Sequence, residues 1–115
     1  MAYNIFIFGD SPSDEPILDF FLGTAGTIDI YWESVGRKLN LPIISTLTEN
    51  ADFEQGLILS SDNLVLFRNE VEQLEKYWTD GDPRVGVPED FFQRINELMD
   101  GISYAIDNGL ELMIA

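Results

Sequence analysis

Two stretches in the second half of the chain decide the fold: LVLFRNEVEQLEKYW at residues 64–78 and FFQRINELMDGISYAI at residues 91–106. In the first stretch the large apolar residues recur three and four positions apart, at Leu64, Phe67, Val71, Leu74 and Trp78. The second repeats this spacing at Phe91, Ile95, Leu98, Ile102 and Ala105, with Phe92, Met99 and Ile106 widening the stripe. Such spacing is typical of amphipathic helices. We therefore expect two long helices that pack together on one face of a small sheet.

Signals at the ends of both stretches support helices. Ser61 or Asp62 is placed to cap the first helix, and a hairpin running through residues 61–63 into 64–67 is the alternative. Pro88 suits the first turn of the second helix, which Asn108-Gly109 should end. The charged residues of the first helix should face away from its apolar stripe or flank it, at Glu70, Glu72, Glu75 and Lys76.

Short apolar runs outside these helices predict strands. They lie at residues 3–8, 56–60 and 110–114. The last of these strands is expected to be buried, and a position next to the first strand is one option for it. The fold class that follows is α+β, in which a small β-sheet is packed on one face by amphipathic helices. Two long helices occupy the C-terminal half, and a length of 115 residues fits a single domain over residues 1–115.

The first half of the chain has weaker patterns. Ser13 is placed to cap a short helix whose apolar side lies at residues 17–22. Residues 27–39 alternate like a strand at their start and repeat like a helix at their end, and we favour the helix. Residues 43–47 fit a strand, and residues 49–54 fit a polar loop.

The charge balance restricts the partners of this protein. The chain has 21 Asp and Glu against six Lys and Arg, which gives a formal net charge of −15. Such a field repels phosphate backbones and anionic membranes, and it attracts basic proteins over roughly 8–10 Å. We therefore expect no nucleic acid and no membrane among its partners. Whether the charge serves recognition or only solubility is open at this point.

Two residue types are absent from the chain, histidine and cysteine. Histidine is the commonest general base near neutral pH and the commonest metal ligand, and cysteine supplies thiolate nucleophiles and thiolate metal ligands. The acidic loops at residues 10–14 and 80–82 do not reproduce the spacing of a calcium-binding loop. The sequence therefore predicts a protein that is not an enzyme and that holds no metal and no cofactor.

No run approaches the roughly 20 apolar residues that a membrane helix needs. The N-terminus also lacks a basic region, and its apolar run at residues 5–8 is far shorter than the core of a signal peptide. A soluble cytoplasmic protein is the expectation that follows.

The strand at residues 3–8 leads into Gly9-Asp10-Ser11, which resembles the first block of the GDSL family of serine esterases. In that family the serine is the nucleophile, so the resemblance implies this role for Ser11. A serine hydroxyl needs a neighbouring base to take its proton, and the family draws that base from a C-terminal histidine. This chain has no histidine, so we interpret the segment as a strand end followed by a turn.

A second resemblance rests on the order of elements in residues 56–114. A short strand at Gly56-Leu57-Ile58-Leu59-Ser60 precedes the two amphipathic helices, an acidic loop rich in Pro and Gly separates them, and a terminal strand follows. This order resembles bacterial immunity proteins of polymorphic-toxin systems, which are small cytosolic proteins that bind a secreted toxin and block it. The resemblance implies an acidic inhibitor whose partner is a basic toxin.

Tight protein interfaces concentrate their binding energy in aromatic anchors that polar groups surround. Two segments of the chain combine these residue types, and they supply the candidate partner-binding residues Asp29, Trp32, Glu33, Tyr77, Trp78, Asp80 and Asp82. The alternative for both tryptophans is the core, because each falls on an apolar stripe. A regulatory or adaptor domain, homodimeric through surplus helix surface, is the alternative function, and a serine hydrolase using Ser11 is the third.

Overall fold

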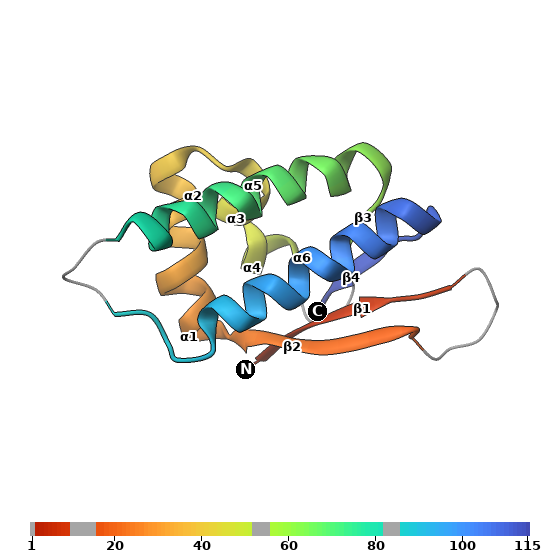
Figure 1. Cartoon of the computed structure of the whole chain (residues 1–115), viewed down its shortest axis with the longest axis horizontal. Helices are drawn as coiled ribbons and strands as arrows, with labels where there is room; N and C mark the ends of the chain where they lie inside the picture. The colour runs from red at the N-terminus through yellow and green to blue at the C-terminus, as the bar shows by residue number, and fades with distance from the viewer. Residues whose placement is uncertain (1, 10–15, 52–55, 82–85) are drawn as a thin grey trace.

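The protein folds around one antiparallel sheet whose spatial strand order is β2-β1-β4-β3 (Figure 1). The strands are β1 (Ala2–Ile7), β2 (Leu18–Thr24), β3 (Leu57–Leu59) and β4 (Leu112–Ile114). The structure is a computed structural model that describes residues 2–9, 16–51, 56–81 and 86–115. The expected α+β class is confirmed, and the terminal strand β4 does lie beside β1.

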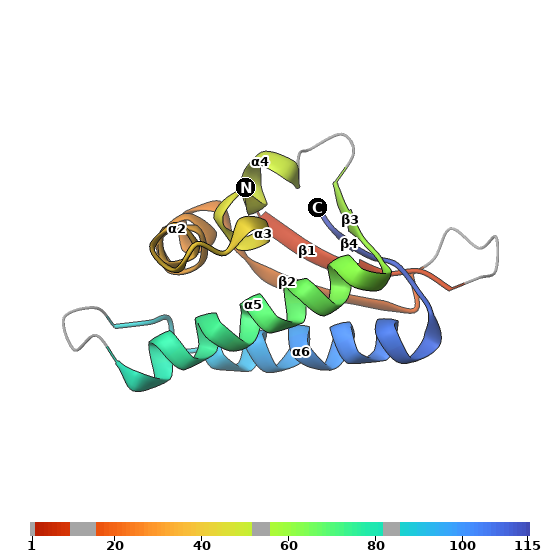
Figure 2. The ribbon, with the colours of Figure 1, turned by 90° about the horizontal axis from the view of Figure 1, so that it is seen from above.

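Helices cover one face of this sheet, and α5 and α6 run side by side along it (Figure 1; Figure 2). The shorter helices group near the N-terminal end of β1 (Figure 2). In chain order the helices are α1 (Ala25–Thr27), the π-helix η1 (Ile28–Glu33), α2 (Ser34–Leu39), α3 (Pro42–Ser45), α4 (Leu47–Asn50), α5 (Ser61–Asp80) and α6 (Phe91–Asn108).

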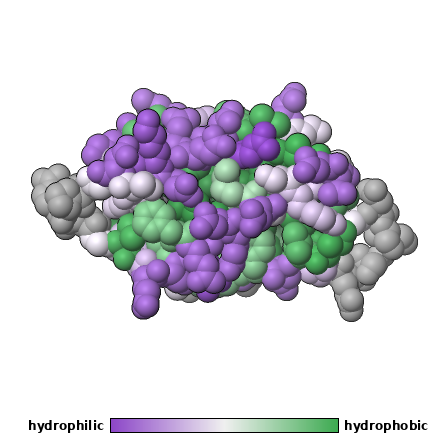
Figure 3. Space-filling view, viewed as in Figure 1, coloured by the Kyte–Doolittle hydropathy of each residue, from purple (hydrophilic) through white to green (hydrophobic). Residues whose placement is uncertain are grey.

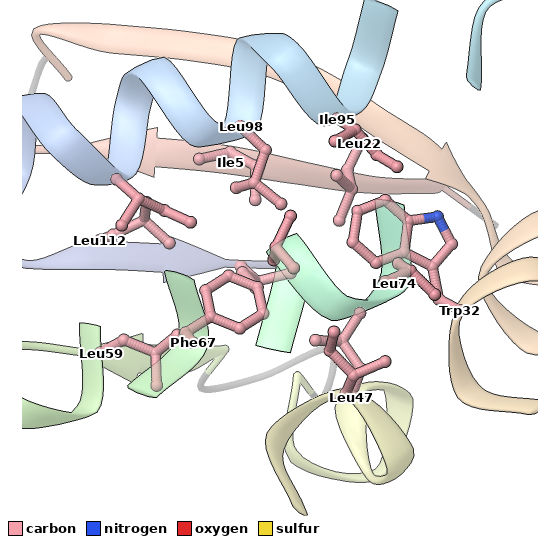
Figure 4. Packing of buried hydrophobic residues seen from close by; sticks show 14 of the residues in the cluster. Ile5, Leu22, Trp32, Leu47, Leu59, Phe67, Leu74, Ile95, Leu98 and Leu112 are labelled. Atoms are coloured by element: carbon pink, nitrogen blue, oxygen red, sulfur yellow. The ribbon is translucent and has the colours of Figure 1, made fainter. Parts of the chain in front are cut away.

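The apolar stripes of both long helices form the centre of the core (Figure 4). All five stripe positions of α5 and all five of α6 are buried, as the spacing predicts. The sheet contributes alternate residues of each strand, among them Ile5, Leu59 and Leu112, and the short helices add Trp32 and Leu47. One cluster of side chains therefore joins elements from both halves of the chain.

Several predicted element ends need correction by a few residues. The N-cap of α5 is Ser60, one residue before the predicted Ser61, and no hairpin forms there. Helix α6 begins at Phe91, because Pro88 lies in a turn in which its carbonyl accepts a hydrogen bond from the Phe91 N–H at 3.0 Å. The predicted end of α6 is confirmed, since Gly109 adopts the left-handed conformation (φ 65°) that favours glycine.

The predicted short helix with its apolar side at residues 17–22 is wrong, because residues 18–24 form the edge strand β2. The strand pairs with β1 from Leu18 to Thr24, and the pairing starts where the Ile17 N–H donates to the Ile7 carbonyl at 2.7 Å. Pairing with β1 satisfies the backbone groups on the inner side of this strand, and it turns Leu18, Phe20 and Leu22 toward the core. The predicted cap, Ser13, lies outside the described residues.

The region from residue 27 to residue 51 is helical throughout its regular elements. The favoured helix over 27–39 is confirmed, with the π-helix η1 leading into α2. The predicted strand over 43–47 is wrong, because Pro42 begins the short helix α3. The predicted loop at 49–54 is helical in its first two residues, which end α4, and residues 52–54 lie outside the described part of the chain.

Gly36 allows α2 and α3 to cross in close contact. A methyl group on its Cα would lie 2.8 Å from the Ser45 backbone nitrogen and 2.9 Å from Cγ2 of Ile44. We expect Gly36→Ala to destabilise the protein by about 2 kcal/mol, since backbone atoms cannot move aside cheaply. The control is Gly26→Ala in α1, where a new methyl group meets no atom within 4 Å. This variant should be about 0.5 kcal/mol more stable toward unfolding than the wild type. Urea unfolding of both variants makes the measurement, and equal changes would contradict the close crossing.

Candidate functional site

The structure brings together the two segments that carry the predicted partner-binding residues. The Trp78 Nε1–H donates to the Tyr31 carbonyl at 2.9 Å, which joins the end of α5 to η1. The rings of Tyr31 and Trp78 lie 5.6 Å apart between centroids, and each lies 6.0 Å from the ring of Phe91 on α6. The two segments therefore meet in an aromatic cluster made by Tyr31, Trp32, Tyr77, Trp78, Phe91 and Phe92.

Most of this aromatic cluster belongs to the core, which corrects part of the predicted patch. Trp32 is 1% exposed and packs edge-on against Phe91, and Trp78 is 9% exposed. Glu33 is also buried, at 5%. Because these side chains are covered within the fold, they present little surface to a partner. The alternative interpretation, which assigned both tryptophans to the core because they fall on apolar stripes, is confirmed.

The remaining predicted residues that the structure describes lie at least partly at the surface. Asp29 and Asp80 are exposed, and Tyr77 is partly exposed. The Tyr77 hydroxyl accepts a hydrogen bond from Lys38 Nζ at 3.1 Å, and the same ammonium lies 5.2 Å from the centroid of the Tyr77 ring. This end of the molecule therefore mixes both signs of charge. Asp82 lies outside the described residues.

Glu33 has a structural role that the sequence pattern did not predict. Its carboxylate accepts hydrogen bonds from the Thr48 hydroxyl at 2.8 and 2.9 Å and from the Thr48 N–H at 3.3 Å. Thr48 lies in the first turn of α4, where backbone N–H groups have no partner within the helix. Glu33 thus serves α4 as a capping group supplied from η1, fifteen residues earlier in the chain.

Glu70 does the same for α3, although the spacing placed it beside or away from the apolar stripe. One carboxylate oxygen accepts from the Ile43 N–H at 3.0 Å and from the Ile44 N–H at 2.9 Å, and the residue is 1% exposed. Pro42 begins α3 without a side-chain cap of its own. A signal for this role is the position of Glu70 three residues after Phe67 and four before Leu74, which keeps it on the buried side of α5.

Burial raises the pKa of Glu70 above its ordinary value of 4.5, because desolvation penalises the carboxylate, while the hydrogen bonds from Ile44 and Ile43 oppose the rise. As the pH rises from 4.5 to the folded-state pKa, the unfolded chain loses the Glu70 proton first. The folded state then holds more protons, so the contribution of Glu70 to stability falls with rising pH. We expect the stability of the wild type relative to Glu70→Gln to fall through this window in urea unfolding between pH 4 and 8. A difference that grows with pH would contradict the dominance of burial.

The concave sites on the described surface are small. A hollow of about 270 Å³ lies between the start of α5 and the end of α6, lined by Ser60, Ser61, Asp62, Leu64, Val65, Ala105, Ile106, Gly109 and Leu110. Within the described ranges, no group of three or more acidic side chains is placed to hold a metal ion, and no helix is long and apolar enough to cross a membrane. Ser11 and Asp10 of the esterase-like block lie outside those ranges.

Comparison with protein-family models, with curated proteins and with solved structures finds no match for this chain. The resemblance to immunity proteins therefore rests on the order and apolar spacing of the C-terminal elements.

The surface of the molecule is strongly hydrophilic on its helical side. Figure 3 shows this side as mainly hydrophilic, with smaller hydrophobic areas between the polar side chains. Exposed carboxylates occur on strands, helices and connections alike, at Asp19, Asp29, Glu49, Asp62, Glu72, Asp80, Glu89, Asp100, Asp107 and Glu111. The five described cations are all on helices, at Arg37, Lys38, Arg68, Lys76 and Arg94.

Proposed function

We propose that this protein is a non-enzymatic inhibitor of the immunity type, which binds a basic toxin in the cytoplasm and blocks it. The observation that carries the proposal is the number of exposed carboxylates on the described surface. Glu33 and Glu70 are the two that the fold itself buries among the described residues, so the negative charge is directed outward. The fold does not need this charge at most of these positions, and a role in recognition accounts for it.

The few described cations neutralise little of this charge. Arg94 lies 3.2 Å from Asp90 and 3.4 Å from Glu97, so its charge is already shared between two carboxylates. A net charge of −15 repels a second copy of the chain and steers a basic protein toward it. Electrostatic steering raises association rates, which suits an inhibitor that must reach its toxin before the toxin acts.

The direct test is neutralisation by co-expression. Genes of immunity proteins lie beside the gene of their toxin, so the toxin to test is a large secreted protein whose gene is found next to the gene of this chain. We expect growth of a host that expresses the toxin domain to be restored by this protein. Ser11→Ala should restore growth equally, because the proposed mechanism uses no serine nucleophile. A failure to restore growth, or restoration that depends on Ser11, would overturn the proposal.

Salt should weaken the association in a characteristic way. With the purified toxin domain, we expect the association rate constant to fall at least tenfold as ionic strength rises from about 0.01 to 1 M, because the Debye length shrinks from roughly 30 to 3 Å. The dissociation rate constant should change much less. Surface plasmon resonance measures both. An association rate that is constant over this range would mean that the acidic surface serves solubility alone.

A further inference from the structure

The face of the sheet that points away from the helices carries a continuous row of apolar side chains. Side chains alternate between the two faces of a strand, and Phe6 lies between Ile5 and Ile7, which are both fully buried in the core. Phe6 is paired with Met113 on β4, and Met113 is paired with Ile58 on β3. Cross-strand partners share a face, so Phe6, Met113 and Ile58 form one row across three strands. We call this row the open-face row.

The side chains of the open-face row are at least partly exposed to solvent. Ile58 is 55% exposed, and Phe6 and Met113 are partly exposed. The ring of Phe8 extends the row, since it stacks on Phe6 with centroids 6.3 Å apart and planes 21° apart. Four large apolar side chains gathered on an uncovered face are typical of the centre of a protein interface.

The charges around the open-face row indicate what kind of partner covers it. Asp19 on β2 is the cross-strand partner of Phe6, and Glu111 directly precedes β4, and both are exposed. The four described strands contain neither Lys nor Arg, and the five described cations all lie on helices. The apolar row is therefore edged by carboxylates within the described residues.

We propose that the open-face row is the surface that contacts the partner, and that the partner is a basic protein whose own contact surface has an apolar centre and a rim of Lys or Arg. The inference rests on the proposed function and names the surface that performs it. A second copy of the chain fits worse, because it would bring Asp19 and Glu111 and a further charge of −15 against the same carboxylates. The aromatic cluster fits worse too, because its rings are largely buried and Lys38 lies at its exposed edge.

A photo-crosslinking residue, p-benzoylphenylalanine, tests the surface even before the partner is identified. It is placed at Ile58 in one variant and at Leu66 on α5 in the control, since both side chains are exposed, at 55% and 42%. After irradiation in a lysate of the native cells, we expect at least tenfold more product from position 58, joined to a protein with an excess of Lys and Arg. Product from position 66 alone, no product from position 58, or a crosslinked dimer of this chain would overturn the proposal.

Binding measurements with the purified partner, once crosslinking has identified it, complete the test. We expect Ile58→Ser to weaken the affinity about tenfold and Leu66→Ser to leave it unchanged. Asp19→Asn should slow association at low salt by at least twofold. Melting temperatures verify that the variants fold. If Ile58→Ser and Leu66→Ser bind equally, the open-face row is not the contact surface. Growth rescue by the wild type would still stand in that case, so the two proposals fail separately.

Discussion

Leu74→Ala is expected to destabilise the protein by about 3 kcal/mol, because it removes methyl groups from the middle of the core and leaves a cavity. Leu74 is fully buried between the sheet, α6 and the short helices (Figure 4). Against a total stability of roughly 5–15 kcal/mol, this loss should lower the melting temperature by on the order of 10 °C. Ile95→Ala on α6, at an equally buried position, should behave in the same way.

The matched control for the buried stripe is Glu72→Ala. Glu72 is exposed on the same helix, two residues before Leu74, so its truncation should change the stability by less than about 0.5 kcal/mol. Calorimetry or urea unfolding of the three variants provides the comparison. Equal melting temperatures for Leu74→Ala and Glu72→Ala would contradict the helical register on which the fold depends.

Glu70→Ala is expected to cost about 2 kcal/mol, although a charged residue on a helix usually tolerates this change. Its carboxylate is the acceptor for the Ile43 and Ile44 N–H groups, and the contact with Ile44 is buried. Removal of the acceptor leaves these donors without a partner, and a buried unsatisfied donor costs roughly 1–3 kcal/mol. Urea unfolding at neutral pH measures the loss.

Two variants separate this capping role from a general effect of charge. Glu70→Gln keeps an acceptor oxygen in nearly the same place, so it should retain most of the stability that Glu70→Ala loses. Glu72→Ala removes the same charge from the exposed side of α5 and should be nearly neutral. If Glu70→Gln loses as much stability as Glu70→Ala, the hydrogen bonds to α3 do not account for the effect.

The candidate site was less predictable than the fold. The sequence placed aromatic and acidic residues of two segments in one patch, and these segments do meet through Trp78 and Tyr31. The sequence did not predict that Glu33 is buried, because composition alone does not distinguish a surface carboxylate from one that caps a distant helix. The open-face row was missed as well, since Phe6 and Met113 become neighbours only through strand pairing.

The sequence by itself determined the two long helices, the strands at both ends of the chain and the acidic surface. Apolar spacing with a helical period is local information, and the five central positions of each predicted stripe are all buried. Net charge is likewise independent of the fold. These features do not depend on which distant residues meet.

Only the tertiary structure decided the state of residues 17–22 and 43–47 and the burial of Glu33 and Glu70. An apolar run such as β2 becomes a strand because β1 offers it backbone partners, and the same run without that edge is compatible with a helix. Glu70 is buried because the N–H groups of α3 lie within reach, although Ile43 is 27 residues away in the chain. Contacts between distant segments carry this information, and local spacing does not contain it.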